Sequence, residues 1–488
     1  MLQPRIAKEL TRIMGDRVLL GELDRAYYSY DCSFFARQNH YFPDAVVLPR
    51  SVEEVAAVMK IAFANRIPVT PRGAGSGAAG GSVPVQGGIV MDLSFWNDIE
   101  EVDAENMQAF VRPGVVHAEL NKYLAKYNLF FPPDPGSTRM CTLGGMVANN
   151  SSGLRAVKYG TTEQYVLGLE VVLPDGRVIT TGGPQCRAIK NVTGYNLTKL
   201  FVGSEGTLGV ITKIRLRLWP RPAARGIVMA VYRELDQAPQ TVLEVYRAGI
   251  MPSGIEILDE SAIKAVNLYR PEINLPDARA ILLFEVDGNP ASVEWEGREI
   301  STIAARRAAA VEWSTDPQRM AELWQGRGVV AAAAAKLRPG GTRIFAGEDV
   351  SVPLNRVAAM LEKIRALSSQ YGIPAVTYGH IGDGNIHTAV IVNPDSEAEL
   401  AAAGRLVDAI HRAAIECGGV TTGEHGVGVA RSDYSAEELG KSLAVMRQIK
   451  NILDPEGIMN PGKIFPRPKN AGAGTKPAQS QPITQHRS

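Results

Sequence analysis

The chain has 488 residues, of which 45% are hydrophobic and 21% are charged, and its formal net charge is +1. This length favours two or three domains over one core, and the composition is that of a folded, water-soluble protein. Nucleic acid is excluded as the main partner, because phosphate binding needs clustered positive charge and the sequence has no run of Lys and Arg.

Cysteine usage and the N-terminal residues narrow the class of protein further. The four cysteines lie far apart in the chain, so they lack the clustering of thiolates that an iron–sulfur centre needs. The N-terminus lacks the apolar segment of a signal peptide, and no run of about 18 apolar residues is present to span a bilayer. We therefore expect a cytoplasmic protein, with any contact to the inner face of the membrane made through partners.

The first part of the chain predicts an α/β unit. Residues 1–40 have a helical pattern, and residues 45–49 form an apolar run typical of a short buried strand. Ser51 and Glu54 have the spacing of a capping box, which predicts an amphipathic helix from there to about Asn65.

A glycine-rich loop, residues 71–81, follows a second short strand at 67–70. It contains the spacing G-x-G-x-x-G at 75–80, and Asp92 ends the next strand. A Rossmann dinucleotide site requires a helix between these two points. Only residues 81–88 intervene, and their proline and glycines do not form a helix of useful length, which excludes a nicotinamide cofactor. The N–H groups of the loop can instead form a nest for a pyrophosphate; the alternative is a plain structural turn.

Strand patterns dominate from there to about residue 220. The clearest strands are 89–93, 109–112 and 171–173, and the turn residues 174–176 predict a hairpin after the last of them. The proline-rich residues 219–222 mark our domain boundary.

Segments dense in small residues interrupt these strands. Such segments let the backbone close around a large, flat, polar cofactor, although periodicity does not say which cofactor. They are residues 133–138, 142–153 and 201–212.

Strands and helices alternate from about 225 to 420. The strand at 281–286 and the helices at 291–310, 354–370 and 396–416 suit a sheet that is covered by helices on one face. Another helix is expected at 437–453. Beyond residue 466 the composition is poor in apolar residues, and we expect a disordered tail.

Two short patches hold three of the seven histidines, at 379–387 and 423–426. Histidine is suited to metal ligation and to proton transfer near neutral pH. Two histidines and one glutamate can supply three ligands to a divalent metal, and a further histidine remains as a base. The alternative is a pair of exposed loops whose histidines only form hydrogen bonds.

Several motifs together resemble a known family. They are P-R-G-A-G-S-G at 71–77, L-G-G at 143–145, G-S-E-G-T-L-G at 203–209 and N-P-G-K at 460–463. These resemble the FAD-binding fold of the vanillyl-alcohol-oxidase type. With the two histidine patches, the chain resembles the flavoprotein subunit of glycolate oxidase and the FAD-linked D-lactate and D-2-hydroxyglutarate dehydrogenases, over about residues 40–465.

The resemblance implies an α+β fold, with a two-part FAD-binding domain and a substrate cap domain made of an antiparallel sheet and helices. The expected divisions are an N-terminal helical segment (1–41), the FAD-binding domain (42–221), the cap domain (222–425), a C-terminal segment that completes the FAD-binding domain (426–465) and the disordered tail (466–488).

The resemblance also implies which residues contact FAD. Ser76 stands where some relatives carry a histidine bonded to FAD, and Cys141 is the only nearby thiol, so we expect FAD to be held non-covalently. The implied FAD-binding residues are Arg72, Gly73, Ala74, Gly75, Ser76, Gly77, Asp134, Pro135, Ser137, Thr138, Gly144, Gly145, Asn149, Ser151, Gly153, Gly206, Ile211 and Asn460.

In this family the histidine patches resemble a metal site and its base. The implied ligands of a divalent metal (zinc, manganese or iron) are His380, His387 and Glu424. The implied catalytic residues are His425 as general base, Arg327 as the anchor of the substrate carboxylate, and Asn385.

Two departures from the family pattern bear on the substrate. Alanines at 331–335 replace a more bulky stretch after Arg327, which leaves room for a substrate larger than glycolate; the alternative is a well-formed helix that only packs on the sheet. Ala346 and Gly347 stand where the 2-hydroxyglutarate enzymes place a cation, which disfavours a dicarboxylate.

The expected reaction is the FAD-dependent oxidation of a D-2-hydroxy acid of the D-lactate or glycolate type, by hydride transfer to flavin. Electrons then pass to a quinone, a carrier flavoprotein or a separate iron–sulfur subunit rather than to oxygen. The chain is expected to form a homodimer or a hetero-complex. The rival functions are an ether-lipid synthase of the same superfamily, a non-catalytic FAD-binding subunit, and a flavin-independent iron oxygenase built on two histidines and a carboxylate.

Overall fold

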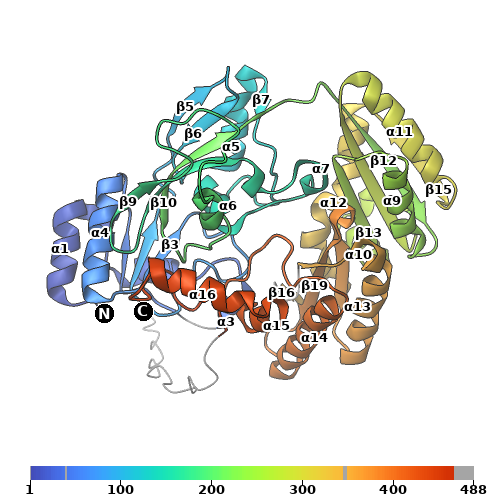
Figure 1. Ribbon diagram of the computed structural model, residues 1–488. Coiled ribbons are helices and arrows are strands. Elements are labelled where there is room, and N and C mark those ends of the chain that lie inside the picture. The colour runs from blue at the N-terminus through green and yellow to red at the C-terminus, as the bar shows by residue number, and fades with distance from the viewer. Residues whose placement is uncertain (1, 39–40, 345–348, 467–488) are drawn as a thin grey trace, which may run out of the picture.

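The structure, a computed structural model, describes residues 2–38, 41–344 and 349–466. Figure 1 shows two lobes, one built by the first half of the chain and the other by the later strands and helices, with α15 and α16 running beneath and between them. The expected disordered tail and the pair Ala346–Gly347 lie outside the described residues. Within the described part of the chain, no helix has the length and apolar character to cross a membrane.

The first sheet has the strand order β1-β2-β4-β3. Its strands are β1 (Val18–Leu19), β2 (Ala45–Val47), β3 (Val69–Arg72) and β4 (Ile89–Asp92). Strands β2 and β3 both run parallel to β4. The chain passes from β3 to β4 without a helix, as expected, so the glycine-rich loop between them makes this connection. The expected strands of this unit are therefore confirmed.

Four helices lie in the described part of the first 65 residues: α1 (Pro4–Met14), α2 (Glu22–Tyr27), α3 (Phe34–Gln38) and α4 (Val52–Asn65). Two of them, α1 and α4, pack against this sheet. The Ser51 side chain caps α4 by accepting from the N–H of Glu54. The second half of the expected capping box is wrong, because the Glu54 carboxylate accepts from the Arg50 N–H and from Arg17 instead.

A second, five-stranded sheet has the order β5-β6-β10-β8-β9 and is antiparallel throughout. The expected hairpin is present, since Leu173 and Arg177 are joined by a backbone hydrogen bond across the turn and Gly176 takes a φ of 83°. Its strands are β5 (Ile99–Asp103), β6 (Gln108–Val111), β8 (Val166–Val172), β9 (Val178–Thr180) and β10 (Val210–Arg217).

Short elements surround this second sheet and carry most of the small-residue segments. Strand β11 pairs with β7, so residues 219–220 still belong to the first lobe by their hydrogen bonds. These elements are α5 (His117–Leu124), β7 (Leu129–Phe130), α6 (Leu143–Asn149), α7 (Ala156–Tyr159), α8 (Leu197–Phe201) and β11 (Trp219–Pro220).

The second lobe is built on an eight-stranded antiparallel sheet of order β15-β12-β14-β13-β18-β19-β16, with β17 pairing to β19. The strands are β12 (Ala224–Tyr232), β13 (Gly254–Asp259), β14 (Ala280–Gly288), β15 (Ala310–Ser314), β16 (Thr342–Ile344), β17 (Val350–Ser351), β18 (Ala375–Gly379) and β19 (Asn385–Val392).

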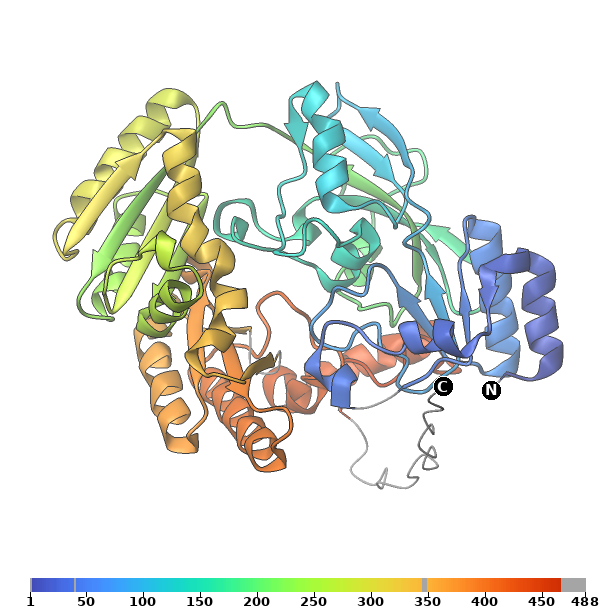
Figure 2. The same cartoon turned by 180° about the vertical axis from the view of Figure 1, so that it is seen from behind.

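Helices cover both faces of this sheet, so the expectation of one covered face is wrong. Leu282 and its neighbours pack under one set of helices, while Ile281 and Leu283 pack under the other. A central strand between two layers is apolar on both sides, as the uninterrupted run at 281–286 is. The first face carries α9 (Gln237–Arg247), α11 (Pro290–Ala304), α13 (Val357–Tyr371) and α14 (Glu397–Glu416). The second carries α10 (Glu260–Tyr269) and α12 (Pro317–Ala333), and Figure 2 shows α12 in gold in front of the strands.

The C-terminal segment returns from the second lobe to the first sheet. The single helix expected at 437–453 is two helices, α15 (Ser435–Leu439) and α16 (Ser442–Leu453). Gly440 separates them with a φ of 55°, a conformation that ends a helix. Met459 then lies parallel to Val69 of β3 and extends the first sheet.

Candidate active site between the two lobes

A cavity of about 1280 Å³ lies between the lobes and is lined by residues of both. This exceeds the usual size of a small-molecule pocket, roughly 300–1,000 Å³, as an extended cofactor and its substrate would require. Of the residues expected to bind FAD, all line this cavity except Gly153 and Asn460.

The glycine-rich loop forms one wall of the cavity. None of its backbone N–H groups from Gly73 to Ala78 donates to an acceptor among the described residues. Unpaired N–H groups along a tight loop form an anion nest. Gly75 takes a φ of 66° and lies against the Arg72 guanidinium, which places a positive charge behind the nest. This wall therefore fits a pyrophosphate.

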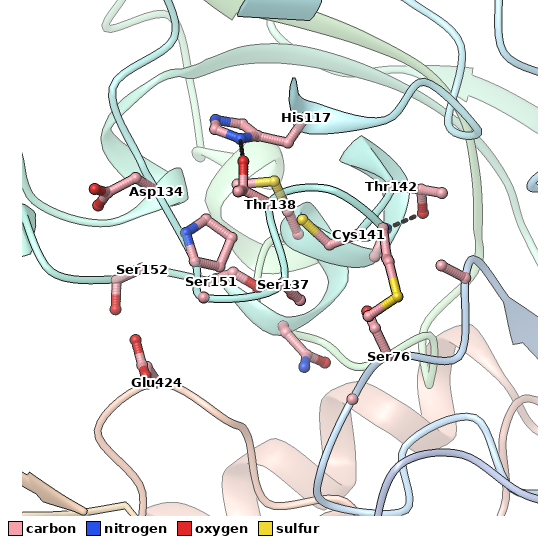
Figure 3. Close-up of a pocket in the computed structure, with 18 of the residues that line it drawn as sticks. Ser76, His117, Asp134, Ser137, Thr138, Cys141, Thr142, Ser151, Ser152 and Glu424 are labelled. Atoms are coloured by element: carbon pink, nitrogen blue, oxygen red, sulfur yellow. Dashed lines mark hydrogen bonds between the residues drawn. The ribbon is translucent and has the colours of Figure 1, made fainter. Parts of the chain in front are cut away.

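The remaining walls near the loop leave room for a flat cofactor. A Cβ on Gly81 or Gly136 would meet no atom within 4 Å, and both residues line the cavity. Ser76 and Cys141 approach the same space, and Figure 3 shows both beside Ser137 and Thr142. Burial raises the pKa of the Cys141 thiol to about 11, so it stays protonated and is a poor nucleophile.

Gly153 and Asn460 lie behind the cavity wall. A Cβ on Gly153 would collide with the backbone of Asp134, so glycine there permits two wall segments to touch. The Asn460 side chain donates to the carbonyl oxygens of Gly81 and Glu205, at 2.8 and 2.7 Å. Asn460 thus ties the glycine-rich loop to the turn before β10, and both residues shape the wall without facing the cofactor space.

The two histidine patches meet at the opposite end of the cavity, around the Glu424 carboxylate. Its Oε1 atom lies 3.6 Å from Nε2 of His380, 3.5 Å from Nε2 of His387 and 3.5 Å from Nε2 of His425. His380 follows β18, His387 lies on β19, and the other two residues stand on the loop that precedes α15. Figure 3 shows Glu424 reaching toward Asp134, Ser151 and Ser152 from the other side of the cavity.

The charges of this cluster depend on one another. Burial disfavours a charged His380, but the Glu256 and Glu424 carboxylates outweigh it and hold the His380 pKa well above its usual value. Burial, together with the charges of His380 and His425, lowers the pKa of His387. Burial opposes ionisation of Glu424, yet the hydrogen bond from His380 and the neighbouring cations lower its pKa to about 2. The cluster therefore combines an ionised Glu424, a protonated His380 and a neutral His387, and a bound metal would displace the Nε2 proton of His380.

This donor set fits a divalent metal. Imidazole nitrogens and a carboxylate are common ligands, and bonds of about 2.0–2.2 Å place tetrahedral ligand atoms roughly 3.3 Å apart. The distances around Glu424 are close to that spacing. A second set is also close, since single ligand atoms of Asp349, His387, Glu424 and His425 lie within 4.8 Å of one another. His425 therefore belongs to the cluster by distance, beside the three ligands implied by the sequence.

Asp349 and Asn385 support the loop that carries Glu424 and His425. The Asp349 carboxylate accepts from the backbone N–H groups of both, at 3.1 and 2.7 Å, and lies 3.6 Å from Nδ1 of His425. Asn385 donates to Asp349 at 3.0 Å and to the carbonyl of Val350 at 3.2 Å. Asn385 does not line the cavity. Asn385 therefore supports the site from behind the cavity wall, because its amide donates to Asp349.

Arg327 lines the cavity from α12, in the same region as the cluster around Glu424. Its Nε donates to Glu256, and its guanidinium lies 4.9 Å from the centroid of the Tyr378 ring. Arg343 lines the same region and donates to the Tyr378 hydroxyl at 2.9 Å and to the Ala331 carbonyl at 3.0 Å. Two guanidinium groups and an aromatic ring thus form the wall opposite the glycine-rich loop.

Sequence reasoning missed Glu256, Asp349, Arg343 and Tyr378. A weak signal existed for Glu256, because it stands between Ile255 and Ile257 in the sequence, and the structure buries it fully. A carboxylate in such a place requires a charged partner.

Comparisons with known proteins place these features among flavoproteins. Residues 43–182 match the family described as "FAD binding domain", and residues 221–464 match "FAD linked oxidases, C-terminal domain". The chain is 38% identical to the glycolate oxidase subunit GlcD of Bacillus subtilis, over 90% of this chain and 92% of that one. It is 35% identical to the mitochondrial D-lactate dehydrogenase [cytochrome] of Arabidopsis thaliana, over 94% of this chain and 80% of that one.

Solved structures share the fold at lower identity. A 4-ethylphenol oxidase from Gulosibacter chungangensis superposes with a TM-score of 0.78 at 20% identity, over 95% of this chain and 97% of that chain. An alkyldihydroxyacetonephosphate synthase superposes with a TM-score of 0.74 at 20% identity, over 95% of this chain and 85% of that chain. These likenesses confirm the expected α+β fold of the vanillyl-alcohol-oxidase type and, at such identity, concern the fold alone.

Proposed function

This chain belongs to the family of FAD-linked oxidases that includes glycolate oxidase subunits and D-lactate dehydrogenases, and we propose that it oxidises a D-2-hydroxy acid to the 2-oxo acid. One observation supports the proposal most strongly. A single cavity, large enough for a cofactor and a substrate, is lined by the anion nest at one end and by three histidines, a glutamate and an arginine at the other. An electron-accepting cofactor and an acid–base site are thus within reach of one substrate.

We assign a separate role in the reaction to each of several residues of the cavity. FAD, when bound, supplies the acceptor for the two electrons of the substrate C–H bond. The Arg327 guanidinium binds the substrate carboxylate through the N–H groups that Glu256 leaves available. His425 takes the proton of the 2-hydroxyl group, with Asp349 behind its Nδ1.

The metal belongs to the proposal and not to the established family assignment. His380, His387 and Glu424 would hold a divalent ion of zinc, manganese or iron, which acts as a Lewis acid and lowers the pKa of a hydroxyl group. The spacing of the Nε2 atoms around Glu424 supports this assignment. FAD is proposed to be bound without a covalent link, since a serine and a protonated, buried thiol face it.

The wall beside Arg327 supports a substrate with a small side chain. Trp324 and Ala331 line the cavity there, while Ala333 and Ala334 are buried in the packing between α12 and the sheet. Of the alanines at 331–335, Ala331 thus lines the cavity, whereas Ala333 and Ala334 pack the helix against the sheet. Space left by Ala331 suits D-lactate better than a bulkier acid, with glycolate as the smaller alternative.

The route of the electrons and the setting of the enzyme are proposed from the sequence and the relatives. The four cysteines lie far apart in the sequence, so we do not assign an iron–sulfur centre to this chain. Electrons would leave for a quinone, a carrier flavoprotein or a separate iron–sulfur subunit in the cytoplasm. One relative is a subunit of a glycolate oxidase, which favours a hetero-complex over a homodimer.

A substrate screen tests the proposal. Purified, FAD-loaded protein is assayed with an artificial electron acceptor and glycolate, D-lactate, L-lactate or D-2-hydroxyglutarate. We expect the highest kcat/KM with D-lactate, a lower value with glycolate, and little turnover of the L-enantiomer. Turnover of D-2-hydroxyglutarate above all others would contradict the assignment of a monocarboxylate, and no turnover of any 2-hydroxy acid would contradict the proposed function.

A further inference from the structure

Glu256 is a fully buried carboxylate on β13, in the middle of the eight-stranded sheet of the second lobe. Each of its oxygens has one partner: Oε2 accepts from Nε of Arg327, and Oε1 contacts Nδ1 of His380. Both partners line the cavity, one as the proposed carboxylate anchor and the other as a proposed metal ligand. Glu256 thus stands directly between the two halves of the substrate site.

The register of the sheet brings these residues together. Strand β13 pairs antiparallel with β18, and Ile257 lies opposite Gly379. The next pair outward is Glu256 with His380, where β18 ends. Arg327 comes from α12, on the second face of the sheet. Three segments separated by more than fifty residues in the chain therefore meet at one carboxylate.

The contact fixes which nitrogen of His380 is used by Glu256 and which is left for a metal. Nδ1 donates to Oε1 of Glu256, so Nε2 is the nitrogen that a metal would bind in place of a proton. The Nε2 atom then faces Glu424 at 3.6 Å. A carboxylate behind the far nitrogen of a ligating histidine holds the ring and makes its free nitrogen a better ligand.

The same carboxylate orients Arg327. Its Nε is used by Glu256, and no other described side chain accepts from the guanidinium. The two terminal N–H groups therefore remain for a ligand. The Tyr378 ring at 4.9 Å holds the plane of the guanidinium from one side. Because Glu256 holds both Arg327 and His380, it would also fix the distance between His380 and a substrate carboxylate bound by Arg327.

We propose that Glu256 is a positioning residue that couples substrate binding to metal binding, by holding Arg327 and His380 with one carboxylate. This rests on the proposed function. Removing the carboxylate is then expected to weaken both metal affinity and substrate affinity, although Glu256 lies outside the lining of the cavity.

Glu256→Gln is the direct test. Arg327 and His380 both donate to Glu256, and a glutamine offers one acceptor oxygen and one donor amide where the carboxylate offers two acceptors, so one contact is lost. In FAD-loaded protein stripped of metal, the affinity for added Zn²⁺ or Mn²⁺ should fall by about 10–100-fold. In metal-saturated enzyme the KM for D-lactate should rise on the order of 10-fold, with a smaller change in kcat.

Asp287→Asn is the matched control. Asp287 is a buried carboxylate on the neighbouring strand β14 and also has two donors, Lys158 at 2.6 Å and Tyr159 at 2.8 Å. Neither donor lines the cavity. This variant should lose stability to a similar degree and keep the metal affinity and KM of the wild type. Equal losses of metal affinity and KM in both variants would show a general effect of buried charge and overturn the proposal.

The remaining outcomes are also decisive. Wild-type metal affinity and KM in Glu256→Gln would overturn the inference and leave the proposed function intact. If Glu256→Gln does not retain FAD, Glu256→Asp carries the test, because its shorter side chain keeps the charge but cannot reach both partners; unchanged metal affinity and KM there would overturn the inference. Absence of metal binding by wild-type protein would instead overturn the metal site of the proposed function, and the inference with it.

Discussion

Glu424 and His425 are neighbours in the chain and differ in their surroundings. Glu424 lies among the Nε2 atoms of His380 and His387, and its pKa is lowered to about 2. His425 is more exposed, with 26% of its side chain accessible, and it has Asp349 behind Nδ1. At the scale of single residues, we thus assign metal binding to Glu424 and proton transfer to its neighbour His425. Substituting one residue at a time can distinguish these two roles.

Glu424→Gln should lose bound metal and activity together. The amide keeps the shape but removes the negative charge among the histidines, so we expect activity to fall by about 10²-fold or more, with FAD retained. Elemental analysis and the flavin content of the purified variant check this. Glu362→Gln, at an exposed glutamate on α13, is the control and should match the wild type. Active wild-type enzyme without metal would show the ligand set to be wrong.

His425→Asn should keep both metal and FAD. Without a general base, the rate of flavin reduction by the hydroxy acid should fall by about 10²–10⁴-fold. Stopped-flow absorbance under anaerobic conditions measures that rate, and added metal should not restore it. Loss of metal from this variant would contradict the assignment and place His425 among the ligands, as its distance from Glu424 also permits.

The non-covalent binding of FAD is a prediction that rests on Ser76 and Cys141. A serine forms no flavin bond, and burial keeps the thiol protonated, with a pKa of about 11. Acid precipitation should therefore release all the flavin into the supernatant, where its absorbance is measured. Fluorescence that stays with the denatured chain on a gel would contradict this.

Residues in the glycine and histidine motifs could be predicted because each motif lies within a few positions of the chain. Glu256 and Arg343 could not be predicted in the same way. Each lies in a strand with no motif around it. The register of β16 with β19 brings Arg343 to the cavity, and the register of β13 with β18 brings Glu256 behind His380. Asn385 was placed in the site because of its motif, yet its amide points to Asp349. A motif thus shows where a site lies more reliably than which side chain faces it.

At the scale of elements, α14 carries a buried histidine with no role in the cavity. His411 is 1% exposed and packs edge-on against Tyr434, with ring centroids 4.7 Å apart. Neither ring nitrogen has a hydrogen-bond partner among the described residues. Burial, together with the nearby charge of Arg431, lowers the His411 pKa to about 3. The folded protein therefore holds this ring neutral.

His411→Phe should make the protein less sensitive to acid. The pKa is about 3 in the folded state and about 6.5 in the unfolded state, so the stability that the neutral ring allows is present above about pH 6.5 and is lost as the pH falls toward 3. Between pH 7 and pH 5 the wild type should lose roughly 2 kcal/mol from this group alone. Phenylalanine keeps the ring contact and removes that loss. Thermal unfolding at both pH values measures it, and equal pH dependence of the two proteins would contradict it.

Elements were predictable where a local pattern decides them. The α4 cap, the hairpin after β8 and the helix-free connection from β3 to β4 all follow from turn residues and short spacing. The second layer of helices on the eight-stranded sheet could not be predicted in this way. Helices α10 and α12 are separated in the chain by strands and other helices and come together only in the folded structure. The apolar run of β14 was the available sign that both faces are covered.

At the scale of the whole molecule, different parts of the chain supply the two ends of the cavity. The first lobe gives the glycine-rich loop. The second lobe gives Arg327 from α12 together with His380 and His387, and the loop before α15 gives Glu424 and His425. The rival function of an ether-lipid synthase gains no support from the alkyldihydroxyacetonephosphate synthase that superposes, because at 20% identity that likeness concerns the fold alone. The proposed hydroxy-acid oxidation differs from the synthase function in one measurable respect. It transfers electrons from the hydroxy acid to the flavin of the enzyme.

Anaerobic addition of D-lactate to metal-replete, FAD-loaded enzyme tests that transfer most directly, with the visible absorbance of the flavin as the readout. We expect full bleaching within the time of a catalytic turnover, partial or slow bleaching with glycolate, and none with L-lactate. The pyruvate formed should equal the flavin reduced. Flavin that stays oxidised with each of these acids, in protein shown to contain FAD and metal, would contradict the account.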